Sequence, residues 1–220
     1  MDELVIFGTG GHAREVAQLV ADINQEQPGR WNLLGFVADP QATTQIIKPL
    51  PAPLLGDGQW LVQHPTVQTV IAVGAPSARR DIALRLAQMQ PSRCYATLVH
   101  PRAWLARRVM LGDGSIIFAG SLINVDVSIG RHASINLGCT LSHDCTLGDY
   151  VSLGPGVNLG GGCHIGAGAD IGVGVSMRPQ TSVGDYCVVG AGAVVVGPLP
   201  PDCIAMGVPA KPTHQQPNEP

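Results

Sequence analysis

The sequence predicts a small α/β domain followed by an all-β solenoid. Three observations lead to this fold class. The 220 residues include 28 glycines but only 4% aromatic and 13% charged residues, while the 45% hydrophobic content excludes a disordered chain. Strand-like and helix-like segments alternate up to about residue 90. From Val99 onward an aliphatic residue recurs at every sixth position.

The first 90 residues have the pattern of a small parallel α/β unit. Short apolar runs predict strands over Leu4–Phe7, Leu33–Val37 and Val67–Val73. Apolar residues at helical spacing predict helices over Glu15–Ile23 and Ser77–Met89, the second with its serine as the N-cap. These alternating elements favour a parallel sheet with helices on its faces.

A glycine-rich loop, Gly8-Thr9-Gly10-Gly11-His12-Ala13, lies between the first expected strand and the first expected helix. It matches the G-x-G-x-x-G/A pattern of Rossmann-like domains, whose helix N-terminus attracts phosphate. Three interpretations stay open: an NAD-dependent dehydrogenase, a tight turn without ligand, and a site for another nucleotide diphosphate. An NAD site has its acidic residue about 20 positions after the loop. Asp39 lies well beyond that spacing, so the third interpretation is favoured.

The second half carries a six-residue repeat. A period of six fits neither a helix nor a simple alternating strand, but it suits a solenoid in which each hexapeptide forms one short strand and one corner. A small residue follows most of the aliphatic residues by four positions, and both are expected to point inward. The aliphatic series is Val99, Leu105, Leu111, Ile117, Ile123, Ile129, Ile135, Leu141, Leu147, Leu153, Leu159, Ile165, Ile171, Met177, Val183, Val189 and Val195.

Charge and cysteine content exclude several classes of function. The net charge of −3, without any basic run, argues against nucleic-acid or anionic membrane partners. No signal-peptide pattern or long apolar span is present, so we expect a cytoplasmic protein. The six cysteines form no C-x-x-C pair and no zinc-like spacing, which predicts reduced thiols and no metal site.

Four motifs together resemble one enzyme family. They are the G-x-G-G-H loop, the uninterrupted hexapeptide solenoid, I-N-x-x-x-x-x-x-H-D-C at Ile135–Cys145 and M-G-V-P-A-K at Met206–Lys211. In this combination the chain resembles the NeuD/PglD-type sugar acetyltransferases. The resemblance implies a Rossmann-like nucleotide-sugar domain (1–95), a left-handed parallel β-helix (96–197), and a turn near coenzyme A with a disordered tail after Pro212 (198–220).

The same resemblance implies an activity and an assembly. Members transfer acetyl groups from acetyl-CoA to the 4-amino group of nucleotide-linked sugars for polysaccharide biosynthesis, and they form homotrimers with acetyl-CoA between neighbouring solenoids. O-acetylation of a sugar or sialic acid is the first alternative, and a non-catalytic nucleotide-sugar-binding trimer is the second. Three hexapeptides complete one coil in this family, which would place Cys145 beneath Cys163 as stacked thiols or, alternatively, as a disulfide.

Site residues follow from the resemblance position by position. His143 corresponds to the general base, Asp144 to the carboxylate that raises its basicity, and Asn136 to a residue near the reaction centre. The expected acetyl-CoA contacts are Ser152, Gly161, Val173, Ala191 and Lys211, and the expected nucleotide-sugar contacts are Gly8, Gly10, Gly11, His12, Asp39 and Gly74. Some relatives carry a second histidine where this chain has Ser152, and many have two acidic residues where only Asp39 is present.

The phase of His143 in the repeat favours a base over a packed or metal-binding histidine. The residue lies two places after Leu141, in neither inward slot, so we expect it at an outward corner. One coil further, Gly161 and Gly162 would leave space beside the ring, and Asp144 can stabilise the imidazolium that forms on proton uptake.

A metal site of the γ-carbonic-anhydrase kind needs three converging histidines. His132, His143 and His164 occur at three different phases of the repeat, which argues against such a site.

Overall fold

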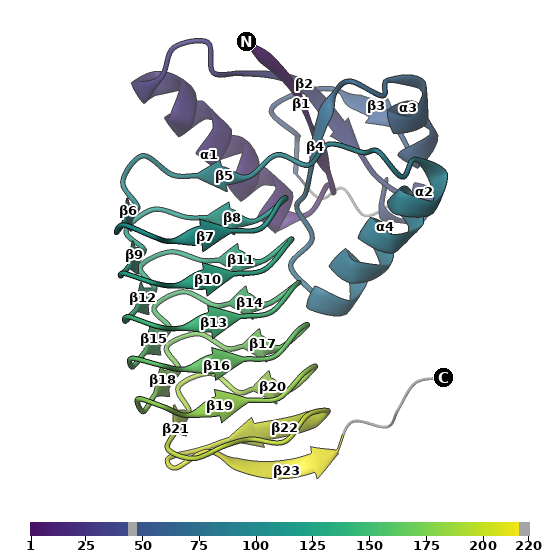
Figure 1. Cartoon of the computed structure of the whole chain (residues 1–220). Coiled ribbons are helices and arrows are strands. Elements are labelled where there is room, and N and C mark those ends of the chain that lie inside the picture. Colours follow the sequence, from purple (N-terminus) through teal and green to yellow (C-terminus); the bar gives the residue numbers. More distant parts are fainter. Residues whose placement is uncertain (44–47, 216–220) are drawn as a thin grey trace. The chain divides into compact units, whose positions relative to one another are not determined.

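The computed structural model describes residues 1–43 and 48–215. The chain forms two compact units, Met1–Pro101 and Arg102–Pro220 (Figure 1). Within the described residues, no helix is both long enough and apolar enough to cross a membrane.

The first unit is built on a four-stranded parallel sheet with the strand order β3-β2-β1-β4. The strands are β1 (Asp2–Phe7), β2 (Trp31–Val37), β3 (Leu54–Gly56) and β4 (Gln68–Ile71). The last four residues of β1 are buried, as expected for a central parallel strand. Because β1 is paired with β2 on one side and β4 on the other, its carboxyl end is the point where ligands bind in open α/β sheets.

The described residues of this unit also form four helices and one further short strand: α1 (Gly11–Glu26), α2 (Pro40–Thr43), α3 (Gly58–Gln63), α4 (Pro76–Met89) and β5 (Leu98–Val99). The expected apolar face of α1 is buried through Val16, Leu19, Val20 and Ile23. The N-cap assignment for α4 was wrong. The helix begins one residue earlier, at a proline with Ala75 as N-cap, because the fixed φ of proline suits the first helical position.

The solenoid strands confirm the predicted six-residue period. Each strand from β5 to β21 is two residues long and ends on a member of the aliphatic series. The strands after β5 are β6 (Trp104–Leu105), β7 (Met110–Leu111), β8 (Ile116–Ile117), β9 (Leu122–Ile123), β10 (Ser128–Ile129), β11 (Ser134–Ile135), β12 (Thr140–Leu141), β13 (Thr146–Leu147), β14 (Ser152–Leu153), β15 (Asn158–Leu159), β16 (His164–Ile165), β17 (Asp170–Ile171), β18 (Ser176–Met177), β19 (Ser182–Val183), β20 (Val188–Val189) and β21 (Val194–Val195).

These strands stack into three parallel sheets, here called faces. The β6 face holds β6, β9, β12, β15, β18 and β21; the β7 face holds β7, β10, β13, β16 and β19; and the β8 face runs from β8 through β11, β14, β17 and β20 to the end of the chain. Each strand pairs with the third strand along the chain, as Thr146 does with His164, so each coil contains three hexapeptides. Figure 1 shows the coils stacked along the solenoid axis.

The solenoid core consists of the aliphatic series and the small residues between its members. From Ile117 onward every member of the series is buried. Cys145 and Cys163 are also buried and are free thiols, so the stacked-thiol interpretation is the one observed. Burial raises the pKa of the neighbouring Cys139 thiol to about 11, which keeps it protonated and unreactive at neutral pH.

The end of the chain forms a hairpin on the β8 face. Strand β22 (Cys203–Met206) pairs in parallel with β20, and β23 (Lys211–Gln215) pairs antiparallel with β22. Residues 213–215 therefore continue as a strand in the segment that was expected to be disordered. The remainder of the tail, residues 216–220, lies outside the described residues.

Each corner of a coil contains one residue with a left-handed backbone, again at a spacing of six. The corner that follows the β6 face, called the His143 corner, has Arg108, Asp126, Asp144, Gly162 and Gln180 at these positions. The corner that follows the β8 face, called the Gly138 corner, has only glycine there: Gly120, Gly138, Gly156, Gly174 and Gly192. Aspartate and glycine tolerate this conformation better than most residues.

Candidate active site

His143 lies at a corner of the solenoid with its ring exposed, where its phase in the repeat predicts it. Its side chain is 61% exposed, and its Nδ1 lies 2.6 Å from Oδ2 of Asp144, which is 65% exposed. A carboxylate can only accept a hydrogen bond, so Nδ1 carries the proton and donates it. The other ring nitrogen, Nε2, then has a free lone pair and can accept a proton from a substrate.

Gly161 lies one coil beyond His143 and leaves room for its ring. A Cβ atom at this position would lie 2.6 Å from Nε2 and 2.7 Å from Cε1 of His143, closer than real Cβ contacts. The backbone continues the stack, since the amide of Gly162 donates to the carbonyl of His143 at 2.9 Å. The absence of a side chain at residue 161 is therefore what allows the observed position of the imidazole.

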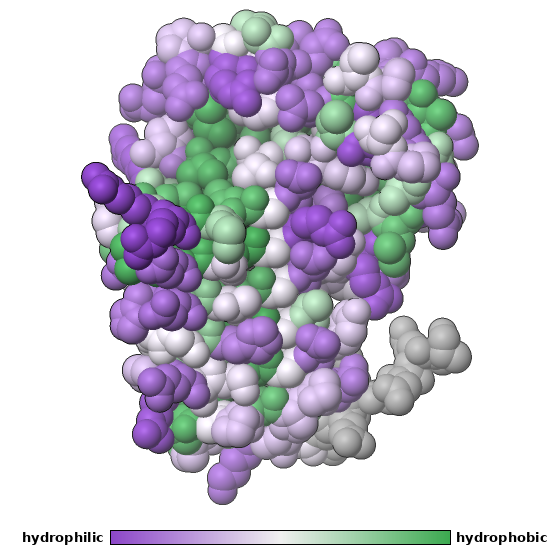
Figure 2. Space-filling view, in the orientation of Figure 1, coloured by the Kyte–Doolittle hydropathy of each residue, from purple (hydrophilic) through white to green (hydrophobic). Residues whose placement is uncertain are grey.

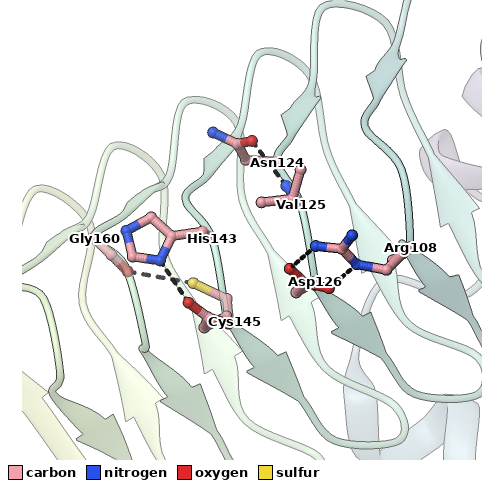
Figure 3. Close-up of polar contacts among 8 residues, drawn as sticks. Arg108, Asn124, Val125, Asp126, His143, Cys145 and Gly160 are labelled. Atoms are coloured by element: carbon pink, nitrogen blue, oxygen red, sulfur yellow. Dashed lines mark hydrogen bonds and ion pairs between the residues drawn. The ribbon is translucent and has the colours of Figure 1, made fainter.

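An ion pair lies on the preceding coils of the His143 corner. Figure 3 shows Arg108 and Asp126 beside the turn that carries His143. The guanidinium donates two hydrogen bonds to the Asp126 carboxylate, at 2.5 and 2.6 Å. This contact lowers the pKa of Asp126 and raises that of Arg108, so both groups stay charged over a wide pH range.

The third expected catalytic residue, Asn136, and the remaining expected acetyl-CoA contacts lie elsewhere on the solenoid. Asn136, Val173 and Ala191 lie at the Gly138 corner, where Val173 is 55% exposed. The side-chain oxygen of Asn136 accepts a hydrogen bond from the Leu137 amide at 2.7 Å. Within one chain, His143 and Asn136 thus follow different faces, β6 and β8, and the two sets of residues are not brought together.

Ser152 and Lys211 both belong to the β8 face. Ser152 is the first residue of β14 and is buried, whereas Lys211 begins β23 and is exposed opposite Met206. Among the described residues, no group of three or more His, Cys, Asp or Glu side chains could hold a metal ion.

The six residues expected to bind the nucleotide sugar line one cavity of about 410 Å³ in the first unit. They come from the carboxyl ends of three strands. Gly8, Gly10, Gly11 and His12 follow β1, Asp39 follows β2 and Gly74 follows β4; the other lining residues are Phe7, Thr9, Ala38, Ala42, Ala72, Val73 and Ile82.

The glycines of this cavity have two different roles. Gly8 has a φ of +127°, and a Cβ there would lie 2.7 Å from the Ala72 carbonyl oxygen, so the turn itself requires glycine. Gly10 and Gly74 have no neighbouring atom within 4 Å of an ideal Cβ position. Their missing side chains leave the backbone open to a ligand at the N-terminus of α1, where the N-cap residue offers no side-chain hydrogen bond and no acidic residue occupies the first turn.

His12 is held neutral at physiological pH. Its side chain is 14% exposed, and its Nδ1 lies 3.2 Å from Glu15. Burial lowers the pKa of His12, the nearby Arg79 lowers it further, and the hydrogen bond to Glu15 opposes both effects only in part. A neutral imidazole can both donate and accept hydrogen bonds toward a ligand.

Arg79 and Arg85 support the cavity but were not identified from the sequence. Arg79 is 1% exposed and donates to the carbonyls of Val73 and Gly74 at 2.7 and 3.0 Å, which fixes the loop after β4. A signal for it existed, because Arg79 precedes Ile82 by three positions on the apolar face of its helix. Arg85, which contacts Asp39, also lies three positions from Ile82, but its position is exposed, so the spacing alone does not distinguish the two arginines.

Comparison with known proteins places both units in one family. Residues 3–86 match the family described as the PglD N-terminal domain. The acetyltransferase domain of PglB from Neisseria gonorrhoeae FA1090, solved in complex with acetyl coenzyme A, is 31% identical with a TM-score of 0.83, covering 96% of this chain and 98% of that one.

A second solved structure is similar over the same extent. A histidine-to-asparagine variant of perosamine N-acetyltransferase from Caulobacter crescentus, in complex with CoA and GDP-perosamine, is 30% identical with a TM-score of 0.84, covering 97% of this chain and 98% of that one. These matches confirm the predicted fold class, a Rossmann-like domain followed by a left-handed β-helix.

A curated protein of Schizosaccharomyces pombe (strain 972), described as an acetyltransferase, is 45% identical over 47 residues. The chain spans 23% of the length of this relative.

Proposed function

Because this chain belongs to the NeuD/PglD-type sugar acetyltransferases, we propose that it transfers the acetyl group of acetyl-CoA to the 4-amino group of a nucleotide-linked amino sugar. The observation that carries the proposal is the hydrogen bond from His143 Nδ1 to Asp144, which leaves Nε2 free above Gly161. The relatives solved with acetyl coenzyme A and with GDP-perosamine support the choice of the two substrates.

In the proposed reaction His143 acts as the general base. Acetyl-CoA supplies the acetyl group as a thioester. Nε2 of His143 removes a proton from the sugar amine as its nitrogen attacks the thioester carbonyl, and the proton then reaches the departing thiolate sulfur. Asp144 orients the ring and stabilises the imidazolium formed during proton uptake. The acetyl group passes directly from sulfur to nitrogen, so no residue of the chain needs to carry it.

The cavity at the glycine loop is the proposed site of the nucleotide. The space left by the missing side chains of Gly10 and Gly74, together with the N-terminus of α1, which has no side-chain cap, supports a diphosphate there. His12 and Asp39 line the same cavity and offer polar atoms for the rest of the ligand.

We further propose a homotrimer in the cytoplasm, with the acetyl-transfer site shared between chains. The expected site residues of one chain lie at two separate corners, so two neighbouring copies would be needed to bring His143 and Asn136 together. Large apolar side chains are exposed on the first coils, including Trp104 at 53%, Met110 at 64% and Leu122 at 47%. Figure 2 shows hydrophobic residues gathered on these coils. Light scattering that shows a fully active monomer would contradict this assembly.

The activity is tested by following thiol release from acetyl-CoA with UDP-, GDP- and dTDP-linked 4-amino sugars, and with sialic acid as a hydroxyl acceptor, with mass spectrometry of the products. We expect a single acetyl group on the amine for one of these acceptors, and release slowed by about 10² to 10⁴ with His143→Ala. Release that occurs only with sialic acid or other hydroxyl acceptors would favour the O-acetyltransferase. Nucleotide-sugar binding without any release would favour a non-catalytic trimer for polysaccharide biosynthesis.

A further inference from the structure

Asp39 forms the boundary between two cavities. It lines the glycine-loop cavity, and it also lines a second cavity of about 180 Å³ together with Asp57, Gly58, Gln59, Arg85 and Met89. One nitrogen of the Arg85 guanidinium donates to both Asp39 oxygens, at 2.7 and 2.8 Å. The pair connects the loop after β2 with α4, two segments far apart in the sequence.

A free Asp39 carboxylate would weaken diphosphate binding in the glycine-loop cavity. Among the described residues that line it, Asp39 is the one carboxylate, and no lysine or arginine is present. The buried Arg79 lies behind the wall, where its guanidinium donates to the carbonyls of Val73 and Gly74. His12 adds no positive charge at neutral pH, because burial lowers its pKa. The N-terminus of α1 contributes only a partial positive charge, so an uncompensated carboxylate in the same cavity would oppose anion binding.

Arg85 supplies the cation that pairs directly with Asp39, from outside this cavity. The exposed fractions of the two side chains are 47% for Arg85 and 33% for Asp39, and a pair this accessible to water adds little to folding stability. The pair does change the charge near the ligand. A phosphate beside Asp39 lies next to an ion pair with no net charge instead of a free carboxylate. Asp39 keeps oxygen lone pairs beyond those used by Arg85 and can still accept hydrogen bonds from ligand hydroxyl groups.

We propose that Arg85 is a positioning residue of the nucleotide site, which fixes the Asp39 carboxylate and cancels its charge beside the bound diphosphate. This inference rests on the proposed function, since it requires a nucleoside diphosphate at the glycine loop. It separates two effects of Asp39: the carboxylate helps to bind the nucleoside part through hydrogen bonds, and Arg85 prevents it from repelling the phosphates.

The test compares ligands that differ only in phosphate charge. Isothermal titration calorimetry at low ionic strength would measure GDP, UDP, guanosine and uridine binding to the full chain. Arg85→Gln should weaken GDP or UDP binding about tenfold and nucleoside binding less than about twofold, because the exposed Asp39 charge acts on the phosphates. Adding Asp39→Asn to Arg85→Gln should restore diphosphate affinity by about fivefold, and Arg85→Lys should stay within about threefold of the unmodified protein.

Arg80→Gln is the matched control. Arg80 lies on the same helix and pairs with Asp81 at the surface, so its removal should leave all four affinities unchanged. Equal diphosphate affinity in Arg85→Gln and the unmodified protein would overturn the inference and leave the proposed function standing. Equal losses for nucleosides and diphosphates, without recovery by Asp39→Asn, would show a merely structural role and would also overturn it. An unmodified protein that binds neither GDP nor UDP would overturn the inference and the proposed function together.

Discussion

Replacing Gly161 with alanine should reduce turnover by displacing His143. The new Cβ would lie 2.6 Å from Nε2, whereas ordinary contacts begin near 3.4 Å, so the ring must move by about 0.8 Å. The backbone of Gly161 is not in the left-handed region, and alanine therefore fits without backbone strain. His143 is 61% exposed and free to rotate away, so we expect a stability change below about 1 kcal/mol.

The expected catalytic effect is much larger than the effect on stability. A displacement of this size at a general base costs up to about 100-fold in rate, so kcat should fall by about 10- to 100-fold. The assay is initial-rate thiol release from acetyl-CoA with both substrates at saturation. Gly197→Ala is the control, because nothing lies within 4 Å of that Cβ position and its φ is not in the left-handed range.

Two outcomes would refute this reasoning. A kcat within about twofold of the unmodified enzyme would show that the ring position is not critical. A higher KM for acetyl-CoA with unchanged kcat would show that Gly161 serves the co-substrate and not the base. In the His143→Ala background, Gly161→Ala should cause no further loss of kcat, because the group it displaces is already absent.

Other substitutions test the base, the glycine loop and the buried imidazole. His143→Ala should lower kcat by about 10² to 10⁴, and Asp144→Asn by less, because it removes the orienting carboxylate but keeps the base. Gly8→Ala should destabilise the fold by about 2 kcal/mol or more in calorimetric melting, because its Cβ would lie 2.7 Å from a carbonyl oxygen. Gly10→Ala should keep the stability of the fold but weaken nucleotide binding. Because burial lowers the pKa of His12, its protonation favours the unfolded chain; the melting temperature should therefore fall as pH drops below about 6.5, and His12→Gln should reduce this fall. A melting curve of His12→Gln with the same acid sensitivity would contradict the last expectation.

The solenoid could be predicted because its constraints are local and repeated. Leu141 sets the inward phase, and His143 two residues later must then lie at an outward corner, as observed. Gly161 follows His143 by three hexapeptides, which is one whole coil, and it therefore lies against the imidazole. Because the period repeats over 17 strands, the position of each residue on its coil follows from its number in the sequence, without any knowledge of distant contacts.

The parts that could not be predicted are short or depend on distant pairs. Strand β3 has three residues and α3 has six, too few for a periodic pattern to be recognised. The contact between Asp39 and Arg85 joins distant segments, and although Asp39 was identified from the sequence, its exposed partner Arg85 does not stand out among the charged residues of its helix. The N-terminus of α4 was misplaced because a serine was preferred as N-cap over a proline at the first helical position.

Because each strand pairs with the third strand along the chain, the solenoid keeps its strands on the same faces only when its length changes by whole coils. A deletion of three consecutive hexapeptides removes one whole coil and leaves every following strand on its own face. A deletion of a single hexapeptide between His143 and Gly161 keeps each aliphatic side chain inward but moves all later strands by one face, so that Gly161 would no longer lie beside His143. Insertions and deletions that preserve the core can therefore still destroy the site, and the chain between His143 and Gly161 can change its length without separating equivalent positions only in steps of whole coils.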